Sequence, residues 1–370
     1  MLQLPELYNN HLKNQLSYPH YIFLLMLIHL LQNIKTVRLE ELARCLPYPI
    51  LLRSRVKKLQ RFLLLEQLHP KKLWFPILKS WVERELNFGE AIYIAIDRSQ
   101  WRNINLLMVS LVYNRRAIPI YFELLPKKGS SKLQQQQQVL SASLELLKNY
   151  EVIVLGDREF CGVDLAKWLS QEKQVYLCLR LRKNEYAELA SDIWFQLSDL
   201  GLQPGISVYY AGIKMTKTKG FAGLNLAAKW KRDYRGKSSK EPWFLLTNLE
   251  SLSRATDAYS KRMGIEEMFR DFKRGGYSLE ETQVNNERLL TIILLITLAY
   301  SWSTFSGEIV KQKGIAKYVT RPTEQKRAYK RHSNFSIGLN SITWLNSIAF
   351  FHELTQELLS RKSFLIPYRR

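Results

Sequence analysis

The sequence predicts an α/β fold: a mixed sheet flanked by helices, with a β-rich insertion and a helical N-terminal domain. Three observations indicate it. Apolar residues have helical spacing over residues 1–85, the period changes to that of strands from Glu90, and strands and helices then alternate. A chain of 370 residues with 46% hydrophobic content is long enough to bury a sizeable core in two or three domains.

The N-terminal segment, residues 1–88, is predicted to be helical. Leu7–Gln32 carries apolar residues at helical spacing, and Val37–Leu65 resembles two short helices around the turn Leu46–Pro49. The second helix is basic, and its cationic residues are Arg53, Arg55, Lys57, Lys58 and Arg61. Two interpretations stay open, a helix-turn-helix that binds DNA and a helical accessory domain with a solvated basic face.

The segment 89–306 is predicted to hold the sheet, because short runs rich in Ile, Val, Leu and Tyr alternate with polar links. In chain order the expected elements are strands at Ala91–Ile96, Ile104–Tyr113 and Ala117–Leu125, a helix at Ser130–Asn149, a strand at Glu151–Leu155 and a helix at Val163–Ser170. Asn114–Arg116 is expected to form the second turn, and the first three strands are antiparallel if hairpins join them.

A β-rich insertion is expected over about residues 174–240, because apolar and polar residues alternate again there. Its expected strands are Val175–Arg180, Ile206–Met215 and Leu224–Trp230. A strand at Trp243–Thr247 and helices at Thr256–Gly275 and Glu287–Phe305 follow. This order of elements is that of a ribonuclease-H-like domain.

The C-terminal segment, residues 307–370, is basic and is expected to carry a helix, with dimerisation as a suggested role. Residues 311–332 are interrupted by Gly314 and Pro322, which is typical of a loop or a flexible arm.

The charge balance predicts a polyanionic partner. Lys and Arg number 55 against 33 Asp and Glu, giving a formal charge of +22, and neutralising phosphates releases condensed counterions. Nucleic acid is the first candidate and an anionic membrane surface the second. The basic residues are spread along the chain rather than gathered on one amphipathic helix, which disfavours a membrane. The apolar runs Tyr21–Leu31 and Leu289–Tyr300 are also shorter than the ~20 residues of a membrane span.

Three acidic residues occupy suggestive positions. Asp97 ends the first expected strand, Asp157 follows the buried strand Glu151–Leu155, and Glu266 lies in the helix after the last strand. Functional groups of open sheets gather where strands end. Cleavage of a phosphodiester requires an activated water and a stabilised leaving oxygen. Two Mg²⁺ ions about 4 Å apart supply both, and Mg²⁺ prefers carboxylate oxygens.

The helix around Glu266 carries a second pattern. Five polar residues spaced by three, four, four and three positions fall within about 80° of arc on one helix face. They are Tyr259, Arg262, Glu266, Arg270 and Lys273. A carboxylate among cations suits a site that binds metal and phosphate together. The alternative is an ordinary surface with ion pairs between residues i and i+4.

These residues resemble a family of bacterial insertion-sequence transposases with a DDE triad. The spacing Tyr-x2-Arg-x3-Glu-x6-Lys over Tyr259–Lys273 matches the Y-R-E-K signature of that family in all residue types and gaps. Asp97–Trp101 is similar to the motif around the family's first aspartate, and Asp157–Phe160 to the motif around its second. The resemblance extends from about Ala91 to Phe305 and is looser at both ends of the chain.

The resemblance implies a ribonuclease-H-like catalytic domain that cuts and rejoins DNA strands, with a β-strand insertion before the glutamate. It implies Asp97, Asp157 and Glu266 as the catalytic residues and as ligands of two Mg²⁺ ions, with Mn²⁺ as a substitute. It also implies contacts with phosphates of the transposon end, made by Tyr259, Arg262 and Lys273. Arg270 joins this DNA-binding group through helical geometry.

The partners implied are transposon ends, target DNA and a second copy of the chain in a synaptic complex, with no membrane. The compartment implied is the bacterial cytoplasm, next to the nucleoid. Two other functions remain as alternatives, a catalytically inactive DNA-binding regulator of transposition and a ribonuclease-H-like nuclease without strand transfer.

Overall fold

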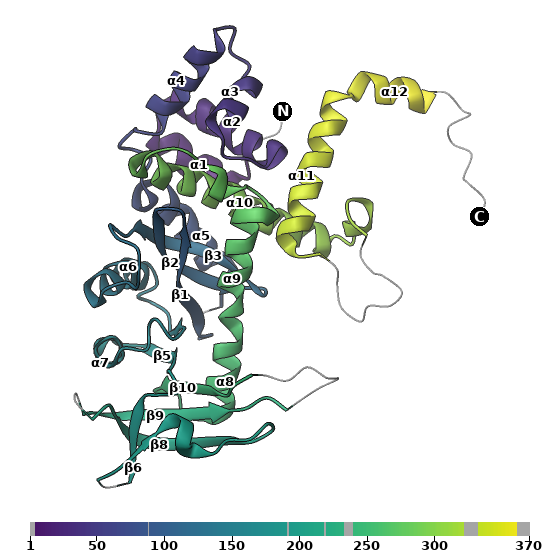
Figure 1. Cartoon of the computed structure of the whole chain (residues 1–370). Helices are drawn as coiled ribbons and strands as arrows, with labels where there is room; N and C mark the ends of the chain where they lie inside the picture. The colour runs from purple at the N-terminus through teal and green to yellow at the C-terminus, as the bar shows by residue number, and fades with distance from the viewer. Residues whose placement is uncertain are drawn as a thin grey trace. The chain divides into compact units, whose positions relative to one another are not determined.

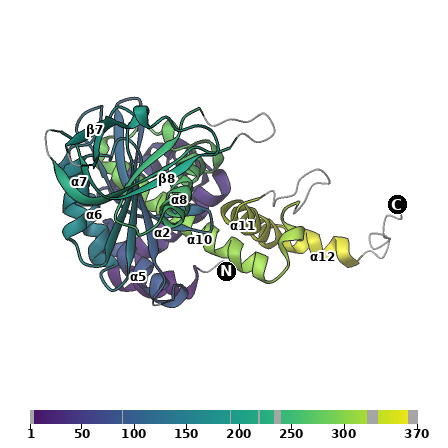
Figure 2. The same ribbon diagram turned by 90° about the horizontal axis from the view of Figure 1, so that it is seen from below.

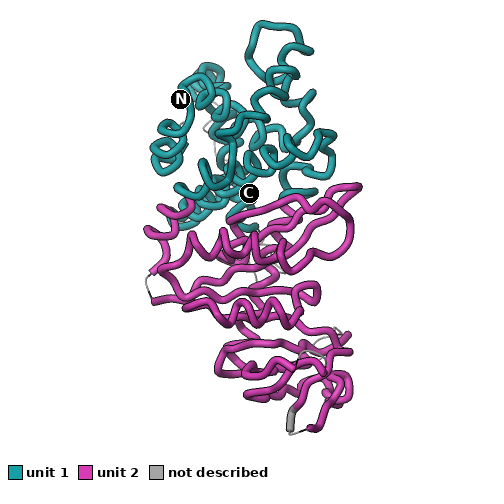
Figure 3. Tube along the Cα trace, turned by 90° about the vertical axis from the view of Figure 1, so that its left-hand side faces the viewer, with its two compact units in different colours: residues 1–77, 272–370 teal, residues 78–271 magenta. Residues whose placement is uncertain are grey.

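The computed structural model describes residues 4–87, 89–190, 192–217, 220–232, 240–321 and 332–360. The chain forms two compact units, Met1–Ile77 with Phe272–Arg370 as unit 1 and Leu78–Asp271 as unit 2 (Figure 3). This division differs from the three segments expected, 1–88, 89–306 and 307–370. The long helix α10 (Asn286–Gln312), expected in the segment 89–306, belongs to unit 1, where it packs on helix α2 (Tyr18–Ile34).

Unit 1 begins with the helices expected over the first 85 residues. They are α1 (Glu6–Gln15), α2, α3 (Leu39–Cys45), α4 (Leu52–Phe62), the π-helical turn η1 (Pro70–Trp74) and the start of α5 (Phe75–Glu85) (Figure 1). The two short helices around Leu46–Pro49 are confirmed as α3 and α4. Arg55 of α4 caps the end of α3, since its Nη1 donates to the carbonyls of Ala43, Arg44 and Leu46 at 3.1–3.2 Å.

Helix α10 forms the centre of unit 1. Tyr8 donates a hydrogen bond to Ser301 at 2.8 Å, and Gln32 donates to the carbonyl of Ala299 at 3.3 Å. Among the residues that the structure describes, α10 is long and apolar enough to cross a membrane, and α2 with α3 passes the same test as one bent span. Since 89% of the apolar window of α10 is buried inside the protein, it has the character of a core helix.

Glycines allow α10 to pack closely on α11 (Asn334–Phe350). A Cβ on Gly307 would lie 1.8 Å from the carbonyl oxygen of Asn334, and one on Gly338 would lie 1.7 Å from that of Ser303. Helix α12 (His352–Ser360) follows α11, and the short 3-10 turns η4 (Leu279–Glu281) and η5 (Ala316–Tyr318) flank α10 in sequence. The arm expected at 311–332 falls partly on residues 322–331, outside the described part of the chain.

Unit 2 is built on one mixed sheet with the strand order β3-β2-β1-β4-β5-β10-β9-β8-β6-β7. Its strands are β1 (Ile92–Trp101), β2 (Ile104–Tyr113), β3 (Arg116–Leu124), β4 (Val152–Gly156), β5 (Val175–Arg180), β6 (Tyr186–Ala190), β7 (Ile193–Gln196), β8 (Ser207–Met215), β9 (Phe221–Lys229) and β10 (Trp243–Thr247). Strands β1, β2 and β3 are antiparallel, whereas β4 and β5 run parallel to β1. Three antiparallel strands followed by two parallel ones confirm the expected ribonuclease-H-like arrangement.

The β2–β3 turn is confirmed at Asn114 and Arg115, which both have positive φ, at 48° and 63°. The insertion differs from the expectation at its start. Strand β5, expected to belong to it, pairs in parallel with β4 in the main sheet. The strands beyond it include β6 and β7, which were not expected, because runs of five and four residues give too few alternations to detect.

Helices cover both faces of the sheet. Helices α6 (Leu133–Leu146) and α7 (Val163–Gln171) lie side by side (Figure 2). Gln138 of α6 reaches Glu123 of β3, which is in register with Leu107 and, through it, with Arg98 of β1. Helix α6 therefore lies on the Arg98 face, because side chains alternate along a strand.

Helix α9 (Met263–Arg270) lies on the opposite face, since its Met268 meets Ser110 of β2, the partner of Ala95. The single helix expected over Thr256–Gly275 is divided here into α8 (Leu252–Lys261), α9 and the π-helical turn η3 (Asp271–Gly275), with Arg262 at the first junction.

Candidate active site

Asp97 lies within β1 rather than at its end, because β1 continues to Trp101 in antiparallel register with β2. The parallel pairing of β1 with β4 stops at Ile96 and Gly156. Asp97 is therefore the first residue of β1 beyond its parallel neighbour. Asp97 was expected where a strand ends, and it does follow the end of the β1–β4 pairing, although β1 itself extends to Trp101.

Asp157 directly follows β4, a strand whose five residues are all buried. The turn after it is tight, because a Cβ on Gly156 would lie 2.8 Å from Cβ of Phe160. The backbone N–H of Glu159 donates to Oδ1 of Asp157 at 2.9 Å, and that of Phe160 donates to the Asp157 carbonyl at 3.0 Å. A buried apolar strand followed by this turn places Asp157 at the sheet edge.

Glu266 is carried by α9, which is held close to the sheet. A Cβ on Gly264 would lie 2.7 Å from the carbonyl oxygen of Arg116 in β3, so only glycine permits this approach. The Arg116 side chain pairs with Asp271 and with Glu267, each at 3.1 Å. Burial raises the pKa of Asp271 to about 6, and Arg116 opposes that shift.

One guanidinium joins two of the three acids. Nη1 of Arg262 lies 3.3 Å from Oδ2 of Asp97, and its Nη2 donates to Oε1 of Glu266. The Arg262 side chain is 11% exposed and that of Asp97 14%, so the contact is largely shielded from solvent. Asp97 from β1 and Glu266 from α9 therefore face the same cation.

The third acid belongs to the same electrostatic neighbourhood. Burial raises the pKa of Asp97 from 3.8 to about 6, and the charges of Asp157 and Glu266 add to the rise. The Arg98 backbone N–H and the Arg262 guanidinium oppose it. Burial alone would lower the pKa of Arg262, but Tyr259, Glu266 and Asp97 raise it above its ordinary value. The three acids expected from the sequence are thus brought together.

A divalent cation suits these residue types. Carboxylate oxygens are the ligands that Mg²⁺ prefers, and a cationic group already sits between Asp97 and Glu266. In the part of the chain that is described, no three His, Cys, Asp or Glu side chains are arranged to hold a metal ion as they stand. The residue types suit a divalent cation, but one could bind only after the Arg262 side chain leaves the space between Asp97 and Glu266.

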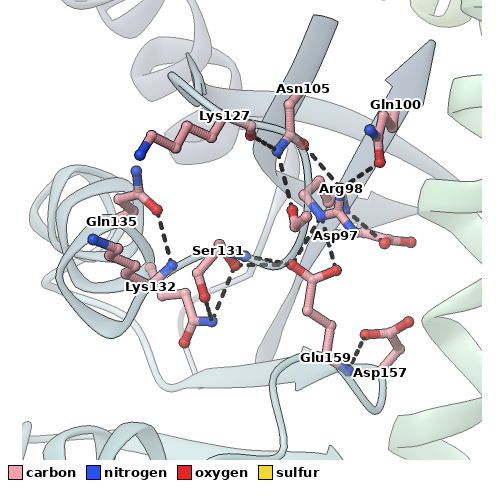
Figure 4. A network of polar contacts seen from close by, with 12 residues as sticks. Asp97, Arg98, Gln100, Asn105, Lys127, Ser131, Lys132, Gln135, Asp157 and Glu159 are labelled. Atoms are coloured by element: carbon pink, nitrogen blue, oxygen red, sulfur yellow. Dashed lines mark hydrogen bonds and ion pairs between the residues drawn. The ribbon is translucent and has the colours of Figure 1, made fainter. Parts of the chain in front are cut away.

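A network of polar contacts lies beside the two aspartates (Figure 4). Nε of Arg98 donates to both carboxylate oxygens of Glu159, at 2.9 and 2.8 Å. Glu159 also accepts from the backbone N–H and the hydroxyl of Ser131, at 2.9 and 3.0 Å. Arg98 and Glu159 lie inside the aspartate motifs Asp97–Trp101 and Asp157–Phe160, but no role was expected for either residue.

The comparisons with known proteins concern this same region. The sequence profile of the family described as "Transposase DDE domain" matches residues 96–302, more than half of the chain. The chain belongs to this family of DDE transposases. The matched interval includes Asp97, Asp157 and Glu266. The narrower group with the Y-R-E-K signature stays a prediction.

No curated protein matches this transposase-family chain in sequence. Among solved structures it is similar to a piggyBac transposase in a synaptic complex with hairpin DNA, with 12% identity, a TM-score of 0.45, and coverage of 99% of this chain and 79% of that one. It is also similar to Marinitoga piezophila Argonaute in complex with a 5′-OH guide RNA, with 12% identity, a TM-score of 0.25, and coverage of 71% and 39%. The family assignment rests on the sequence profile alone.

The four residues expected to bind DNA do not form one solvent-facing ridge in this transposase. Tyr259 is 3% exposed, and its ring packs edge-on against Trp243 with centroids 5.0 Å apart. Arg262 is also buried, whereas Arg270 is exposed and pairs with Glu267. Lys273 belongs to unit 1, where it lies 2.7 Å from Glu280. The ridge is interrupted because the helix breaks at Arg262 and its first half faces the protein interior.

Two further arginines lie near Tyr259. Burial raises the pKa of the Tyr259 hydroxyl, while Arg262 and Arg180 of β5 oppose the rise. Burial lowers the pKa of Arg158, and Arg180 adds to that effect. Both arginines pair with Glu241. Arg158 directly follows Asp157 in the sequence, and this adjacency could have indicated that Arg158 lies near the site.

Proposed function

We propose that this protein is a transposase that cleaves DNA at insertion-sequence ends and joins the freed strands to target DNA, in a reaction that depends on Mg²⁺. The observation that carries the proposal is the convergence of Asp97, Asp157 and Glu266 within the matched family interval. Burial raises the pKa of Asp97, and the charges of Asp157 and Glu266 add to the rise, so a charged Asp97 is costly to maintain in a site without a cationic ligand.

The proposed catalytic residues are the three acids, which would hold two Mg²⁺ ions, or Mn²⁺ in their place. Bound divalent ions would activate the attacking water or 3′ hydroxyl and stabilise the leaving oxygen. Asp97 and Asp157 each receive a backbone N–H at Oδ1, which orients the carboxylates and leaves Oδ2 for other partners. Arg262 neutralises Asp97 and Glu266 until a ligand replaces it.

DNA phosphates are the partner proposed for the cations of α9 and the turn after it. Arg270 pairs with Glu267 and Lys273 with Glu280, and phosphate oxygens can replace a glutamate as the partner of either cation. Arg262 and Tyr259 complete the proposed DNA-binding set from a buried position next to the acids. The formal charge of +22 supports a long contact with a polyanion.

Helix α4 is a second proposed DNA contact. Arg55 is engaged with the carbonyls at the end of α3, whereas Arg53, Lys57 and Arg61 are exposed along α4. A basic helix held at a fixed turn suits binding in the manner of a helix-turn-helix, with α4 against the DNA.

A second copy of the chain is the proposed partner of α11 and α12, as expected for a synaptic complex. These helices and Phe351 between them expose many large apolar side chains, namely Trp344, Leu345, Ile348, Phe350, Phe351, Leu354, Leu358 and Leu359. None of the α12 residues is buried in the single chain. With DNA as its substrate, the protein is proposed to act in the bacterial cytoplasm, at the nucleoid.

The test is cleavage of a DNA fragment that carries the ends of the element encoding this chain, incubated with a target plasmid and Mg²⁺. Wild type is compared with Glu266→Gln and with the matched control Glu145→Gln, whose side chain is exposed on α6 and pairs only at the surface with Lys148. We expect end cleavage and joined products for wild type and for Glu145→Gln, and neither for Glu266→Gln. A gel-shift assay checks that all three bind the ends.

Each alternative gives a different result. Binding without cleavage by wild type would indicate a regulator, and cleavage without joined products would indicate a nuclease that lacks strand transfer. Equal cleavage by wild type and Glu266→Gln would show that Glu266 is not catalytic.

A further inference from the structure

The sheet opens at the two aspartates. Strands β1 and β4 are paired in parallel up to Ile96 and Gly156. Beyond that point β1 continues with β2, while the chain leaves β4 through a turn toward α7. Asp97 and Asp157 are the first residues after the split, so no main-chain pairing fixes the distance between them.

A side-chain pair spans this split. The Arg98 side chain is 18% exposed and that of Glu159 is 16% exposed, and they meet at 2.8 Å. The backbone N–H of Arg98 donates to Oδ1 of Asp97 at 2.7 Å, and the backbone N–H of Glu159 donates to Oδ1 of Asp157 at 2.9 Å. Arg98 thus bonds to Asp97, and Glu159 to Asp157, through a backbone N–H, while the side chains of Arg98 and Glu159 bond to each other.

The pair is itself anchored to the loop between β3 and α6. Nη1 of Arg98 donates to Asn105 at 3.0 Å, and Asn105 donates to the carbonyls of Lys127 and Gly129. Ser131 donates to Glu159 through its hydroxyl and its backbone N–H (Figure 4). An ion pair whose side chains also bond to Gln100, Asn105 and Ser131 has little freedom to adjust.

The pair lies on the α6 side of the sheet. Arg98 alternates with Asp97 along β1, and Asp97 faces Arg262 on the α9 side. The Glu159 carboxylate bonds to Arg98 and Ser131 on the face of the sheet opposite Arg262. We therefore do not count Glu159 among the proposed metal ligands Asp97, Asp157 and Glu266.

We propose that Arg98 and Glu159 are a positioning pair that sets the separation of Asp97 and Asp157, and thereby the affinity of the site for a divalent cation. This inference rests on the proposed function, since it takes the two aspartates as metal ligands. Two carboxylates repel each other and move apart unless the backbone that carries them is held. The Arg98–Glu159 pair supplies the missing connection where the β1–β4 ladder ends.

The experiment measures binding of Mn²⁺ to the full-length protein by electron paramagnetic resonance of free Mn²⁺, with no DNA and no turnover. The variants are Glu159→Gln, Arg98→Gln and the double variant, with Asp97→Asn as the ligand control and Glu145→Gln as the surface control. Melting temperature is measured for each. Loss of an outer-shell partner weakens metal binding by about 10-fold or more, and we expect this for Glu159→Gln.

Arg98→Gln and the double variant are expected to bind Mn²⁺ as weakly as Glu159→Gln and no weaker, because the two residues act as one unit. Arg98→Lys is expected to recover part of the affinity, since it restores the charge without the contacts to Gln100 and Asn105. If Glu159→Gln does not fold, Ser131→Ala removes the hydroxyl contacts to Glu159 and Gln136 and should weaken Mn²⁺ binding measurably while leaving the Arg98–Glu159 pair in place.

Unchanged Mn²⁺ affinity in Glu159→Gln would overturn the inference, and so would losses that add in the double variant. Wild type that binds no Mn²⁺, or binds it equally well after Asp97→Asn, would instead refute the metal site of the proposed function, and the inference with it. Wild-type affinity that depends on Asp97 but not on Glu159 would leave the proposed function standing and sink the positioning pair alone.

Discussion

Gly264→Ala tests whether the position of α9 on the sheet controls the chemistry. The added methyl group would lie 2.7 Å from the backbone oxygen of Arg116, about 0.7 Å short of the 3.4 Å at which ordinary contact begins. Because the obstacle is backbone, α9 must move away from β3. Glu266 lies two residues further along the same helix and moves with it.

Stability and activity should respond differently to this change. Overpacking costs about 1–3 kcal/mol, while replacing glycine by alanine inside a helix recovers about 1 kcal/mol. The net loss is therefore about 0–2 kcal/mol, or a fall in Tm of no more than about 8 °C. A displacement near 1 Å of a catalytic group costs about 100-fold in rate, so we expect end cleavage to fall by about 10- to 100-fold.

The assay compares cleavage rates and melting curves of wild type, Gly264→Ala and the control Gly162→Ala. A Cβ at Gly162 meets nothing within 4 Å, so that variant should keep wild-type cleavage and lose under about 1 kcal/mol as a changed helix cap. Gly264→Ala that melts lower but cleaves at the wild-type rate would refute the link between helix position and chemistry.

Three further predictions follow from charges in the structure. In metal-free buffer at pH 7.5, Asp97→Asn should raise the free energy of unfolding by up to about 3 kcal/mol, because the Asp97 carboxyl has a pKa of about 6 in the folded protein and its charge destabilises the fold at this pH. The gain should vanish below about pH 4, where the carboxyl is protonated in both the folded and the unfolded chain. Urea unfolding at the two pH values measures the difference. Arg116→Ala should cost about 3–5 kcal/mol in urea unfolding well above pH 6, because Arg116 no longer lowers the raised pKa of Asp271 and the charged carboxylate loses its partner. The exposed control Arg44→Ala should cost under about 1 kcal/mol, and equal losses would contradict the role given to the Arg116–Asp271 pair. Lys57→Ala should reduce the slope of log affinity against log salt by about 1 in a filter-binding assay, and an unchanged slope would remove α4 from the DNA contact.

The parts of the site found from the sequence are those that local patterns determine. Strand β4 has five consecutive apolar or glycine residues, all buried, so the acid after it had to lie at a sheet edge. Glu266 was predicted from spacing along one expected helix, and in the structure α9 carries it although the helix is divided into α8, α9 and η3. The convergence of Asp97 with these two was implied by the resemblance, and the structure brings the three together.

The parts that could not be found depend on which strands are neighbours. Arg98 and Glu159 are 61 residues apart, and their contact exists only because β1 and β4 pair in parallel and end at the same level. The burial of Tyr259 depends on Trp243 in a strand that the sequence could place but not orient. The break at Arg262 has no proline or glycine at that position to indicate it.

Arg262 shows how spacing along the sequence and contacts between distant segments combine in one side chain. Its spacing from Glu266 predicts an ordinary ion pair between residues i and i+4, and that pair is present. Docking of the helix adds Asp97 as a second carboxylate partner, which changes a surface pair into a buried cation between two acids. If the acids take up Mg²⁺, this guanidinium loses both partners while remaining desolvated, and such a group needs a new anion close by. A phosphate of the DNA held by the same site would supply it, so the buried position of Arg262 is compatible with the DNA contact expected from the sequence.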